Sequence, residues 1–265
     1  MGLVAAAGAL ILLASGCGRS SGTAAAAPPR SRSAYTLMQM NLCLSGLAGC
    51  YARVRYPAVL GEAVAQIRHA HPDAVTFNEA CGRDVALIAR RTGYHVRFSS
   101  IIYHGAPLAC IRPRGRGLFG DAVLTRAAIE RAESRPFPSQ AGPEQRQWLC
   151  VGTRVAIDVC TAHLASRDPD EASANAPQCA ELRAVLARRA RGRGRTVIFG
   201  GDLNRLPSCA PPGFWTRTDA EARQDPGSQQ VYGTGALRSP SARVQPATHT
   251  DHDILFVRAA LGAQR

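Results

Sequence analysis

Lysine is absent from this 265-residue sequence, so all 32 of its basic residues are arginine. Acidic residues number 19, which leaves a formal net charge of +13. This positive excess predicts a polyanionic partner, and nucleic acid and an anionic membrane surface both fit it. The alternative is that most of the arginines form a solvated surface that binds no ligand.

The sequence also lacks an apolar run of the about 20 residues that a membrane-spanning helix needs. Residues 3–14 are apolar or small, and polar residues follow from position 18. This pattern is typical of an export signal over residues 1–17, and the residues before Cys17 resemble a bacterial lipobox. We therefore expect an exported protein. It is either a cell-surface lipoprotein tethered to the membrane through lipidated Cys17 or a secreted protein cut near residues 24–27.

Residues 18–33 are rich in Ser, Ala and Pro, and we expect them to form a disordered tether. The whole sequence is 46% hydrophobic, which is enough to bury one sizeable core. We therefore expect residues 34–265 to form a single, monomeric domain.

No Cys-x-x-Cys spacing occurs, which disfavours a zinc site. Eight cysteines remain apart from Cys17, an even number that favours disulfides in an exported chain. Pairing of neighbours would give Cys43–Cys50, Cys81–Cys110, Cys150–Cys160 and Cys179–Cys209. The Cys150–Cys160 bond has the best support, because it would join two strand-like segments across a turn at Gly152. Sequence alone leaves about a hundred connectivities open.

Strand and helix patterns alternate in the first part of the domain. Residues 35–43 and 73–77 predict strands, and residues 57–69 and 83–91 predict helices. Two successive strand–helix units favour an α/β fold with some parallel pairing. The remaining expected elements are strands at 94–98, 120–125, 128–132, 147–151, 154–163, 196–199 and 254–257, a helix at 168–191, and loops at 205–247 with weak strand signals around Val231 and Tyr232.

The strand at 196–199 leads directly into Gly200-Gly201-Asp202-Leu203-Asn204. We interpret the two glycines as a sharp turn, after which Asp202 and Asn204 point to the same side of an extended chain. A carboxylate and a carboxamide placed in this way suit a phosphate and a water beside a cation. Ordinary turn chemistry is the alternative interpretation.

Other polar residues stand at similar places, where apolar strands end or begin. They are Asn41, Glu79, His163, Asp251 and His252. Strand ends of an open α/β sheet converge on one edge, so these side chains and the Asp202 motif predict one shared site. Taken singly, each has a structural alternative, such as a helix cap at Glu79 or a buried core histidine at His163.

Six short motifs carry a family resemblance: Met40-Asn41, Asn78-Glu79-Ala80, Gly120 to Arg126, Thr161 to Leu164, Gly201 to Asn204, and Thr250 to Asp253. Their order resembles that of the endonuclease/exonuclease/phosphatase superfamily, which includes deoxyribonuclease I-like domains. The resemblance covers residues 35–257. It implies a four-layer α/β sandwich, in which two packed mixed β-sheets are flanked by helices. It also implies hydrolysis of phosphate esters with a divalent metal.

Phosphate-ester hydrolysis requires neutralised charge, an oriented water and an assisted leaving group. Hard oxygen ligands favour Mg²⁺, with Mn²⁺ or Ca²⁺ as alternatives. We expect Glu79 to be the first metal ligand, with Asn41 beside it and Asp251 as a second carboxylate.

The resemblance implies roles for the remaining site residues. Asp202 would orient or activate the attacking water, and Asn204 would bind a phosphate oxygen. His252 would act as a base or a phosphate contact, and His163 would stabilise charge that develops on the phosphoryl oxygens.

Two departures from the family pattern affect these expectations. Many relatives have an Asp that holds the last histidine, whereas residues 229–232 contain no acid. Either Asp219 or Asp225 takes its place, or His252 is oriented in another way. In the motif that begins at Gly120, Asp121 stands where relatives often have Asn.

Three interpretations of the substrate remain open. An exported nuclease would use the arginine-rich stretch from Arg112 to Arg116, together with Arg126 and Arg146, to bind the phosphate backbone. A sphingomyelin or phospholipid phosphodiesterase would use Phe214-Trp215 as an exposed apolar loop, and a phosphatase belongs to the same alternative. A non-catalytic surface protein would keep the fold for binding alone.

Overall fold

A computed structural model describes residues 1–3, 33–192 and 195–262 of the chain. The expected lipidation site Cys17 and almost all of the expected export signal and tether lie outside these residues. The described residues from Ser33 onward belong to one compact unit. Within the described residues, no helix combines the length and apolar character needed to cross a membrane.

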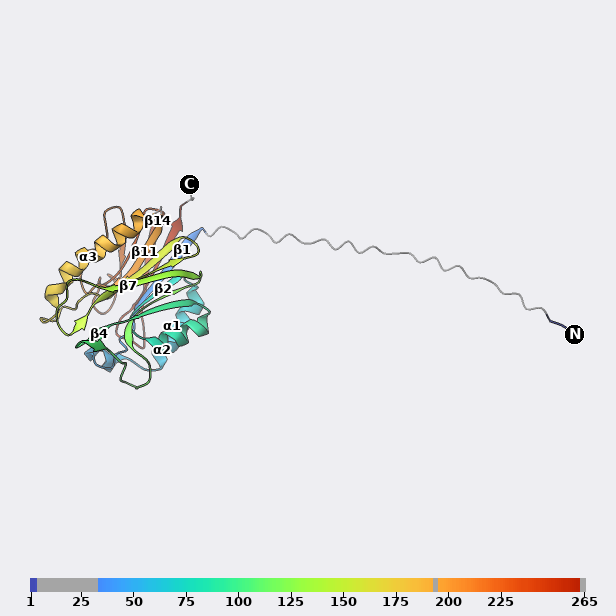
Figure 1. Cartoon of the computed structure of the whole chain (residues 1–265), viewed down its shortest axis with the longest axis horizontal. Coiled ribbons are helices and arrows are strands. Elements are labelled where there is room, and N and C mark those ends of the chain that lie inside the picture. Colours follow the sequence, from blue (N-terminus) through green and yellow to red (C-terminus); the bar gives the residue numbers. More distant parts are fainter. Residues whose placement is uncertain (4–32, 193–194, 263–265) are drawn as a thin grey trace. The chain divides into compact units, whose positions relative to one another are not determined.

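The domain has four layers, with α1 and α2 on one outer face, α3 on the other and two β-sheets between them (Figure 1). The helices are α1 (Ala58–Ala70), α2 (Gly82–Thr92) and α3 (Ala172–Arg191). This arrangement confirms the predicted four-layer α/β sandwich.

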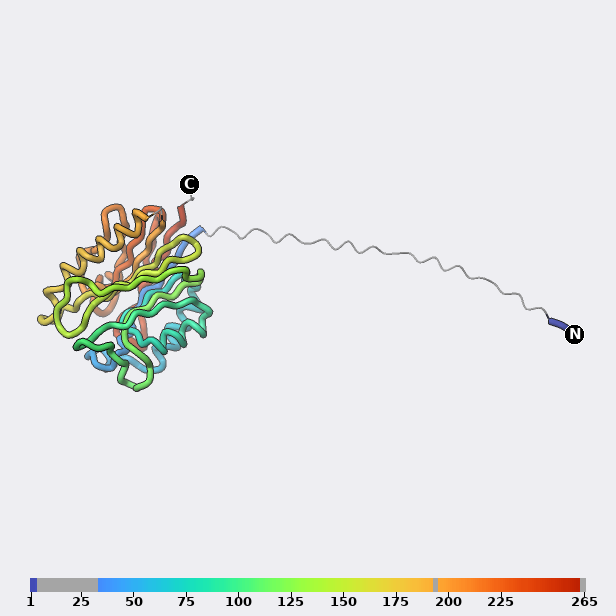
Figure 2. The backbone as a smooth tube through the Cα atoms, in the orientation of Figure 1, coloured from blue at the N-terminus to red at the C-terminus, as the bar shows by residue number. Residues whose placement is uncertain are grey.

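The first sheet has the strand order β14-β15-β1-β2-β6-β3. β1 pairs with β2 in parallel, and the other neighbours are antiparallel. Figure 2 shows the first strand of the domain, in blue, beside the last one, in red. The strands are β1 (Ala34–Asn41), β2 (Ala74–Cys81), β3 (His95–Ser100), β6 (Phe119–Thr125), β14 (Leu237–Gln245) and β15 (Ile254–Leu261).

The second sheet has the order β12-β13-β11-β10-β9-β7, with β10 and β11 parallel. Its strands are β7 (Ile129–Pro136), β9 (Gln147–Thr153), β10 (Ile157–Ala162), β11 (Thr196–Asp202), β12 (Trp215–Thr218) and β13 (Gln229–Gly233). A small third sheet contains β4 (Ile102–Tyr103), β5 (Ala106–Pro107) and β8 (Glu144–Gln145).

Three hydrophobic cores separate the four layers. Alternate residues of β1 show the division, because Met38 and Met40 pack toward α1 and α2 whereas Leu37 packs toward the second sheet. The third core joins the second sheet to α3 through residues such as Phe199 and Leu182. The side-chain period of two in a strand therefore lets each sheet contribute to two cores.

Over residues 205–247, the weak strand signal at Val231 and Tyr232 corresponds to β13, but the prediction of loops elsewhere in this segment is wrong, because it also contributes β12 and β14. β14 is an edge strand in which only Leu237 is buried, so it lacks the alternation that marks a half-buried strand. β13 is buried throughout but includes Gln229 and Gln230, whose amides bond to other groups inside the domain. Because of these two glutamines, the sequence of β13 is partly polar although the strand lies inside the domain.

The four expected disulfides between neighbouring cysteines are all present: Cys43–Cys50, Cys81–Cys110, Cys150–Cys160 and Cys179–Cys209. Cys150 and Cys160 lie directly opposite each other on the antiparallel pair β9 and β10. The hairpin that was expected to hold this bond is therefore formed.

Gly200 and Gly201 do not form the predicted turn, because both lie inside β11. A Cβ atom on Gly200 would lie 2.6 Å from Oγ1 of Thr76 and 2.7 Å from Cδ2 of Leu37, both in the other sheet. A Cβ on Gly201 would lie 2.3 Å from the carbonyl oxygen of Ala162. Gly200 is therefore needed for close approach of the two sheets, whereas Gly201 is needed for close approach to β10 within its own sheet.

We predict that Gly200→Ala lowers the free energy of unfolding by about 2 kcal/mol, because an added methyl overpacks the contact between the sheets. Urea denaturation followed by circular dichroism measures this change. Gly61→Ala is the matched control, since Gly61 lies in α1 with no atom within 4 Å of the added Cβ. The control should leave stability unchanged or raise it by up to about 1 kcal/mol through helix propensity. Equal effects of the two changes would contradict the prediction.

Candidate functional site

Five strands bring their polar residues to the same end of the sandwich. Asn41 ends β1, Glu79 lies near the end of β2, and Asp202 ends β11. His163 follows β10 and pairs with Asp202 in a parallel bridge. Asp251 and His252 precede β15, which runs antiparallel to β1 and so begins where β1 ends. The predicted convergence of these separated residues is present in the structure.

Asn41 joins the two sheets at this end. Its Nδ2 donates to Oε1 of Glu79 at 2.8 Å and to Oδ2 of Asp202 at 3.0 Å. Its Oδ1 accepts the backbone N–H of Cys43 at 3.0 Å. Asn41 therefore orients two carboxylates of the site, which is a positioning role in addition to the metal-binding role expected for it.

Glu79 has a strained backbone at a break in strand pairing. The register between β2 and β6 shifts between Phe77 and Ala80, and Glu79 has a φ of 54°. Left-handed backbone at a non-glycine residue is costly and is often found at functional sites. Burial raises the pKa of Glu79 to about 7, although the hydrogen bond from Asn41 and the nearby His252 act in the opposite direction.

His252 lies between two carboxylates. Its Nε2 is 3.8 Å from Oδ2 of Asp202 and 3.8 Å from Oδ2 of Asp251. Burial would lower the pKa of His252, but Asp202, Asp251 and Glu79 outweigh it and raise that pKa. Burial would likewise raise the pKa of Asp202, but His252 together with the hydrogen bonds from Asn41 and from the backbone N–H of Asn204 outweighs it and lowers that pKa. The two groups thus favour the charged states of an ion pair.

Neither of the acids considered as a partner for His252 takes that role. Asp219 instead accepts hydrogen bonds from the backbone N–H and Nε2 of Gln229, both at 3.1 Å. Burial raises the pKa of Asp219 to about 6. Within the described residues, Nδ1 of His252 is buried without a hydrogen-bond partner, so Asp225 does not hold it either. Asp202 and Asp251, whose carboxylates lie near Nε2, are the neighbours that raise the pKa of the ring most.

Arg146 lies at the site but not in the role expected for it. Its guanidinium donates to Nδ1 of His163 and to Glu171, each at 2.8 Å, and it also pairs with Glu144 at 2.8 Å. These contacts engage both amino groups of a buried side chain, so the expectation that Arg146 binds substrate is corrected. Arg146 positions His163.

The contact with Arg146 also fixes the state of His163. Arginine can only donate, so Nδ1 of His163 accepts and the ring proton lies on Nε2. Burial and Arg146 lower the pKa of His163 to about 3. Nε2 lies 3.8 Å from Oε1 of Glu79, and its other neighbour is Nδ2 of Asn204 at 3.0 Å, which is also a donor and so does not accept the ring proton. His163 therefore presents a neutral N–H to the site and carries no positive charge there.

Sequence reasoning missed the structural role of Asn78 and Asp121. Asn78 donates to Oδ1 of Asp121 at 2.8 Å, and its Oδ1 accepts the backbone N–H of Asp202 at 2.9 Å. Asn78 thus ties the Asp202 strand to the opposite sheet. Burial raises the pKa of Asp121 to about 7. The sequence did contain a signal for Asn78, because it stands beside Glu79 in a polar pair near the end of an apolar strand.

Two further arginine predictions are corrected by the structure. Arg126 follows the far end of β6, where its backbone N–H bonds to Asp73 at the start of β2, so it lies at the opposite end of the sheet from Glu79. Arg116 is buried, bonds to Asp84 at 3.1 Å and stacks 4.7 Å from the ring of Tyr56. Within the basic stretch, exposed side chains remain at Arg112 and Arg114.

The chemistry of the donors fits a hard divalent cation. Glu79 and Asp251 offer carboxylate oxygens, which Mg²⁺ prefers. Cys43 and Cys50 lie close to Glu79, but their sulfurs are joined in a disulfide and are not thiolates. A cation would also balance the buried negative charge of Glu79.

We predict that Mg²⁺ binding weakens as the pH falls below about 7, because the metal competes with the proton on Glu79. Above that pKa the carboxylate is ionised and affinity should level off, whereas below it affinity should fall by about tenfold per pH unit. Isothermal titration calorimetry of the metal-free domain in buffers of different ionisation enthalpy measures both affinity and proton release. Asp121→Asn, which removes the other acid with a similar pKa, should keep this profile. An affinity independent of pH between 5 and 8 would contradict the prediction.

A sandwich of this kind, with carboxylates, amides and histidines gathered at its strand ends, defines a phosphoric ester hydrolase. The chain belongs to the Endonuclease/Exonuclease/phosphatase family, whose model matches residues 49–252. No match to the chain is found among curated protein sequences.

Solved structures share the fold. The endonuclease/exonuclease/phosphatase from Beutenbergia cavernae is 20% identical with a TM-score of 0.62, and the alignment covers 87% of this chain and 72% of that one. The human Nocturnin catalytic domain with bound sulfate is 14% identical with a TM-score of 0.64, covering 86% and 93%. D. rerio TDP2 with a single-strand DNA product is 14% identical with a TM-score of 0.60, covering 86% and 99%.

Proposed function

We propose that this protein is an exported, divalent-metal-dependent phosphodiesterase that acts on nucleic acid. The observation that carries the proposal is the convergence of Glu79, Asp202 and His252, from three separate segments, on one polar cluster bridged by Asn41. A catalytically inactive binding protein would have no need for a buried ion pair beside a strained metal-ligand candidate.

Glu79 and Asp251 would hold the metal, which when bound would neutralise charge on the phosphoryl group. Asp202 is ionised at neutral pH and would orient the attacking water. His252 favours its protonated form, so it would contact a phosphate oxygen in preference to acting as the base. Asn204 and the neutral Nε2–H of His163 would donate hydrogen bonds to the phosphoryl oxygens.

Nucleic acid as the substrate is supported by the net charge of +13 and by the exposed arginines Arg112 and Arg114. The structure of D. rerio TDP2 holds a single-strand DNA product on the same fold. The lipid alternative loses its apolar loop, because Phe214 packs on the core beside α3 and Nε1 of Trp215 bonds to the carbonyl of Leu237 at 2.6 Å.

Export is supported by the pattern over residues 1–17 and by four disulfides, which persist in oxidising compartments. We propose a lipid tether at Cys17 and a monomeric catalytic domain. Lipid labelling of the full chain and of Cys17→Ser tests the tether, and size-exclusion chromatography with light scattering tests the monomer.

The direct test incubates residues 33–265 with Mg²⁺ and, separately, plasmid DNA, RNA, sphingomyelin and an aryl phosphodiester, with and without a chelator. We expect cleavage of nucleic acid and of the aryl diester that the chelator abolishes. Cleavage of sphingomyelin alone would overturn the nucleic-acid substrate. Activity that persists without divalent ions would overturn the metal-dependent mechanism.

A further inference from the structure

Arg53 lies at the edge of the site and was not singled out by the sequence. It ends the short 3-10 helix η1 (Gly49–Arg53), and its Nη2 is 3.2 Å from Oδ2 of Asp251. The side chain of Asp251 is 3% exposed, whereas that of Arg53 is 51% exposed. The guanidinium therefore reaches from solvent to a buried carboxylate of the site.

The same carboxylate oxygen contacts His252. Oδ2 of Asp251 is 3.8 Å from Nε2 of His252, so Arg53 lies beside the residue that we propose contacts phosphate. The other amino group of Arg53 donates to Gln224. Each amino group of Arg53 keeps a second N–H beyond these contacts, and the side chain is half exposed, so the guanidinium can still donate to a phosphate from solvent. Arg146 cannot, because its contacts with His163 and two carboxylates occupy it.

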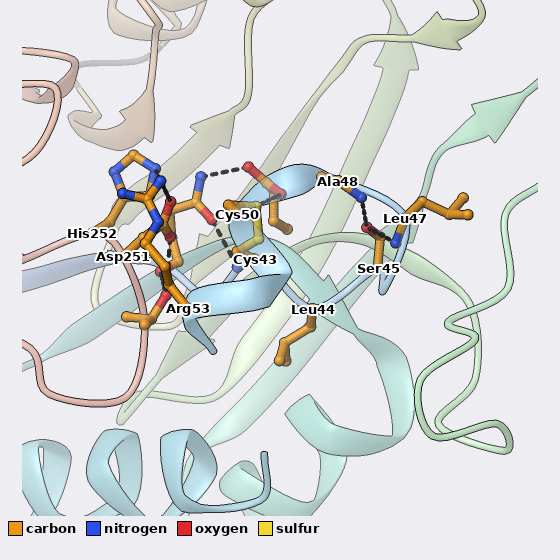
Figure 3. The surroundings of a disulfide bond; sticks show 12 residues. Cys43, Leu44, Ser45, Leu47, Ala48, Cys50, Arg53, Asp251 and His252 are labelled. Carbon is orange, nitrogen blue, oxygen red and sulfur yellow. Dashed lines mark hydrogen bonds and ion pairs between the residues drawn. A yellow bond between two sulfur atoms is a disulfide. The ribbon is translucent and has the colours of Figure 1, made fainter. Parts of the chain in front are cut away.

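The Cys43–Cys50 disulfide fixes the segment that carries Arg53. Cys43 lies just after β1, with its N–H bonded to Asn41, and Cys50 lies in η1, three residues before Arg53. Sγ of Cys50 is 3.8 Å from Oε2 of Glu79. Figure 3 shows the disulfide, with Arg53, Asp251 and His252 to one side of it. The bond thus ties the start of η1 to the strand that ends in the site.

Hydrogen bonds hold the rest of this segment. Oγ of Ser45 accepts the N–H groups of Leu47 at 3.1 Å and Ala48 at 3.3 Å (Figure 3). Beyond η1, the N–H of Arg55 donates to the carbonyl of His249 at 3.0 Å, two residues before Asp251. The loop is therefore closed at both ends. Without the disulfide, η1 would be held by the bond from Arg55 and by the hydrogen bond from the Tyr51 hydroxyl to the carbonyl of Arg112, and its first residues would lose their covalent tie to the end of β1.

We propose that Arg53 is a phosphate-binding residue of the site and that the Cys43–Cys50 disulfide is the element that positions it. The inference rests on the proposed phosphodiesterase function. A phosphate that reaches the carboxylates and His252 from solvent meets the exposed guanidinium of Arg53. The ordered loop supplies that donor in place, which lowers the conformational entropy lost on binding.

The test of Arg53 compares Arg53→Ala with Arg154→Ala. Arg154 is an exposed arginine in the turn between β9 and β10. Arg154→Ala therefore changes the net charge by the same amount as Arg53→Ala, but at the end of β10 that lies away from His163. Arg53→Ala should lower kcat/KM for the aryl diester by about 10- to 100-fold, the loss expected for a hydrogen bond to a charged group. Added methylguanidine should restore part of it. The control should match wild type.

A second readout does not require turnover. Inorganic phosphate should raise the midpoint of thermal unfolding of the wild type and of Arg154→Ala in the presence of Mg²⁺, but not of Arg53→Ala. If wild type hydrolyses none of the substrates, the proposed function fails while this binding test still decides on Arg53. Wild-type kcat/KM together with wild-type phosphate stabilisation in Arg53→Ala would overturn the inference.

The positioning role is tested with the double change Cys43→Ala/Cys50→Ala. It should reduce phosphate stabilisation as Arg53→Ala does, and adding Arg53→Ala to it should produce no further loss in kcat/KM. The matched control Cys150→Ala/Cys160→Ala removes a disulfide between two hydrogen-bonded strands and should keep phosphate binding. If the kcat/KM losses of Cys43→Ala/Cys50→Ala and of Arg53→Ala multiply in the combined variant, the disulfide does not act through Arg53.

A milder variant keeps the disulfide test decisive if the double change prevents folding. Ser45→Ala removes the hydroxyl that orders the loop but retains all four disulfides. It should raise KM in the wild-type background and leave KM unchanged in the Arg53→Ala background. A KM effect of the same size in both backgrounds would overturn the positioning role.

Discussion

Glu79→Gln should lower phosphate-ester hydrolysis by about 10³-fold or more, because the change removes the carboxylate proposed as the first metal ligand and leaves charge on the phosphoryl group unbalanced. Glutamine nearly matches the shape of glutamate and can still accept the hydrogen bond from Asn41. Steady-state assays across Mg²⁺ concentrations measure the loss. Calorimetry should show that binding of Mg²⁺ is lost with activity.

Stability provides the control for Glu79→Gln. Burial raises the pKa of Glu79 to about 7, so the folded state favours the protonated acid and loses stability as the pH rises from the ordinary glutamate range through 7. The neutral amide avoids that loss. The metal-free variant should therefore be as stable as the metal-free wild type, or more stable, at pH 8. Full activity in a folded Glu79→Gln protein would contradict the site assignment.

His252→Asn should lower kcat by about 10²- to 10⁴-fold, the range for a side chain that donates or accepts a proton or stabilises charge in the transition state. The neighbouring carboxylates raise the pKa of His252, which extends the pH range over which the ring is a cation. Wild-type kcat should then fall as the pH rises above that pKa, and this alkaline limb should be missing from the residual activity of the variant.

His69→Asn is the matched control for this change, because His69 is exposed on α1 and outside the site. It should leave both kcat and the alkaline limb unchanged. If His252→Asn keeps the limb, another group titrates in that range. If the limb has the opposite sign, with kcat rising as the pH rises, His252 acts as the base.

Much of the site could be predicted from strand ends. Asn41, Glu79, Asp202 and His252 each stand where an apolar segment stops or starts, and parallel strands deliver such residues to a common edge. Arg146 and Arg126 were misjudged because charge in a sequence does not show whether a guanidinium is already paired. Arg146 is enclosed by two carboxylates and His163, and Arg126 follows a strand that runs away from the site.

Arg53 shows the opposite error. Nothing in its local sequence indicates a site, since it follows a loop and a short 3-10 helix. Its place beside Asp251 depends on a disulfide and on contacts with residues about 200 positions away. Long-range contacts of this kind are set by the packing of the whole domain.

The sequence by itself determined the layered α/β fold, the family and the strand-end residues that gather at the site, because side-chain periodicity and short motifs are local properties. The tertiary structure alone decided how the pKa values of the site residues shift, which arginines are held in ion pairs within the domain, and why position 200 must be glycine. Those properties depend on burial and on the distance between groups in different strands, and both arise only when the two sheets pack together.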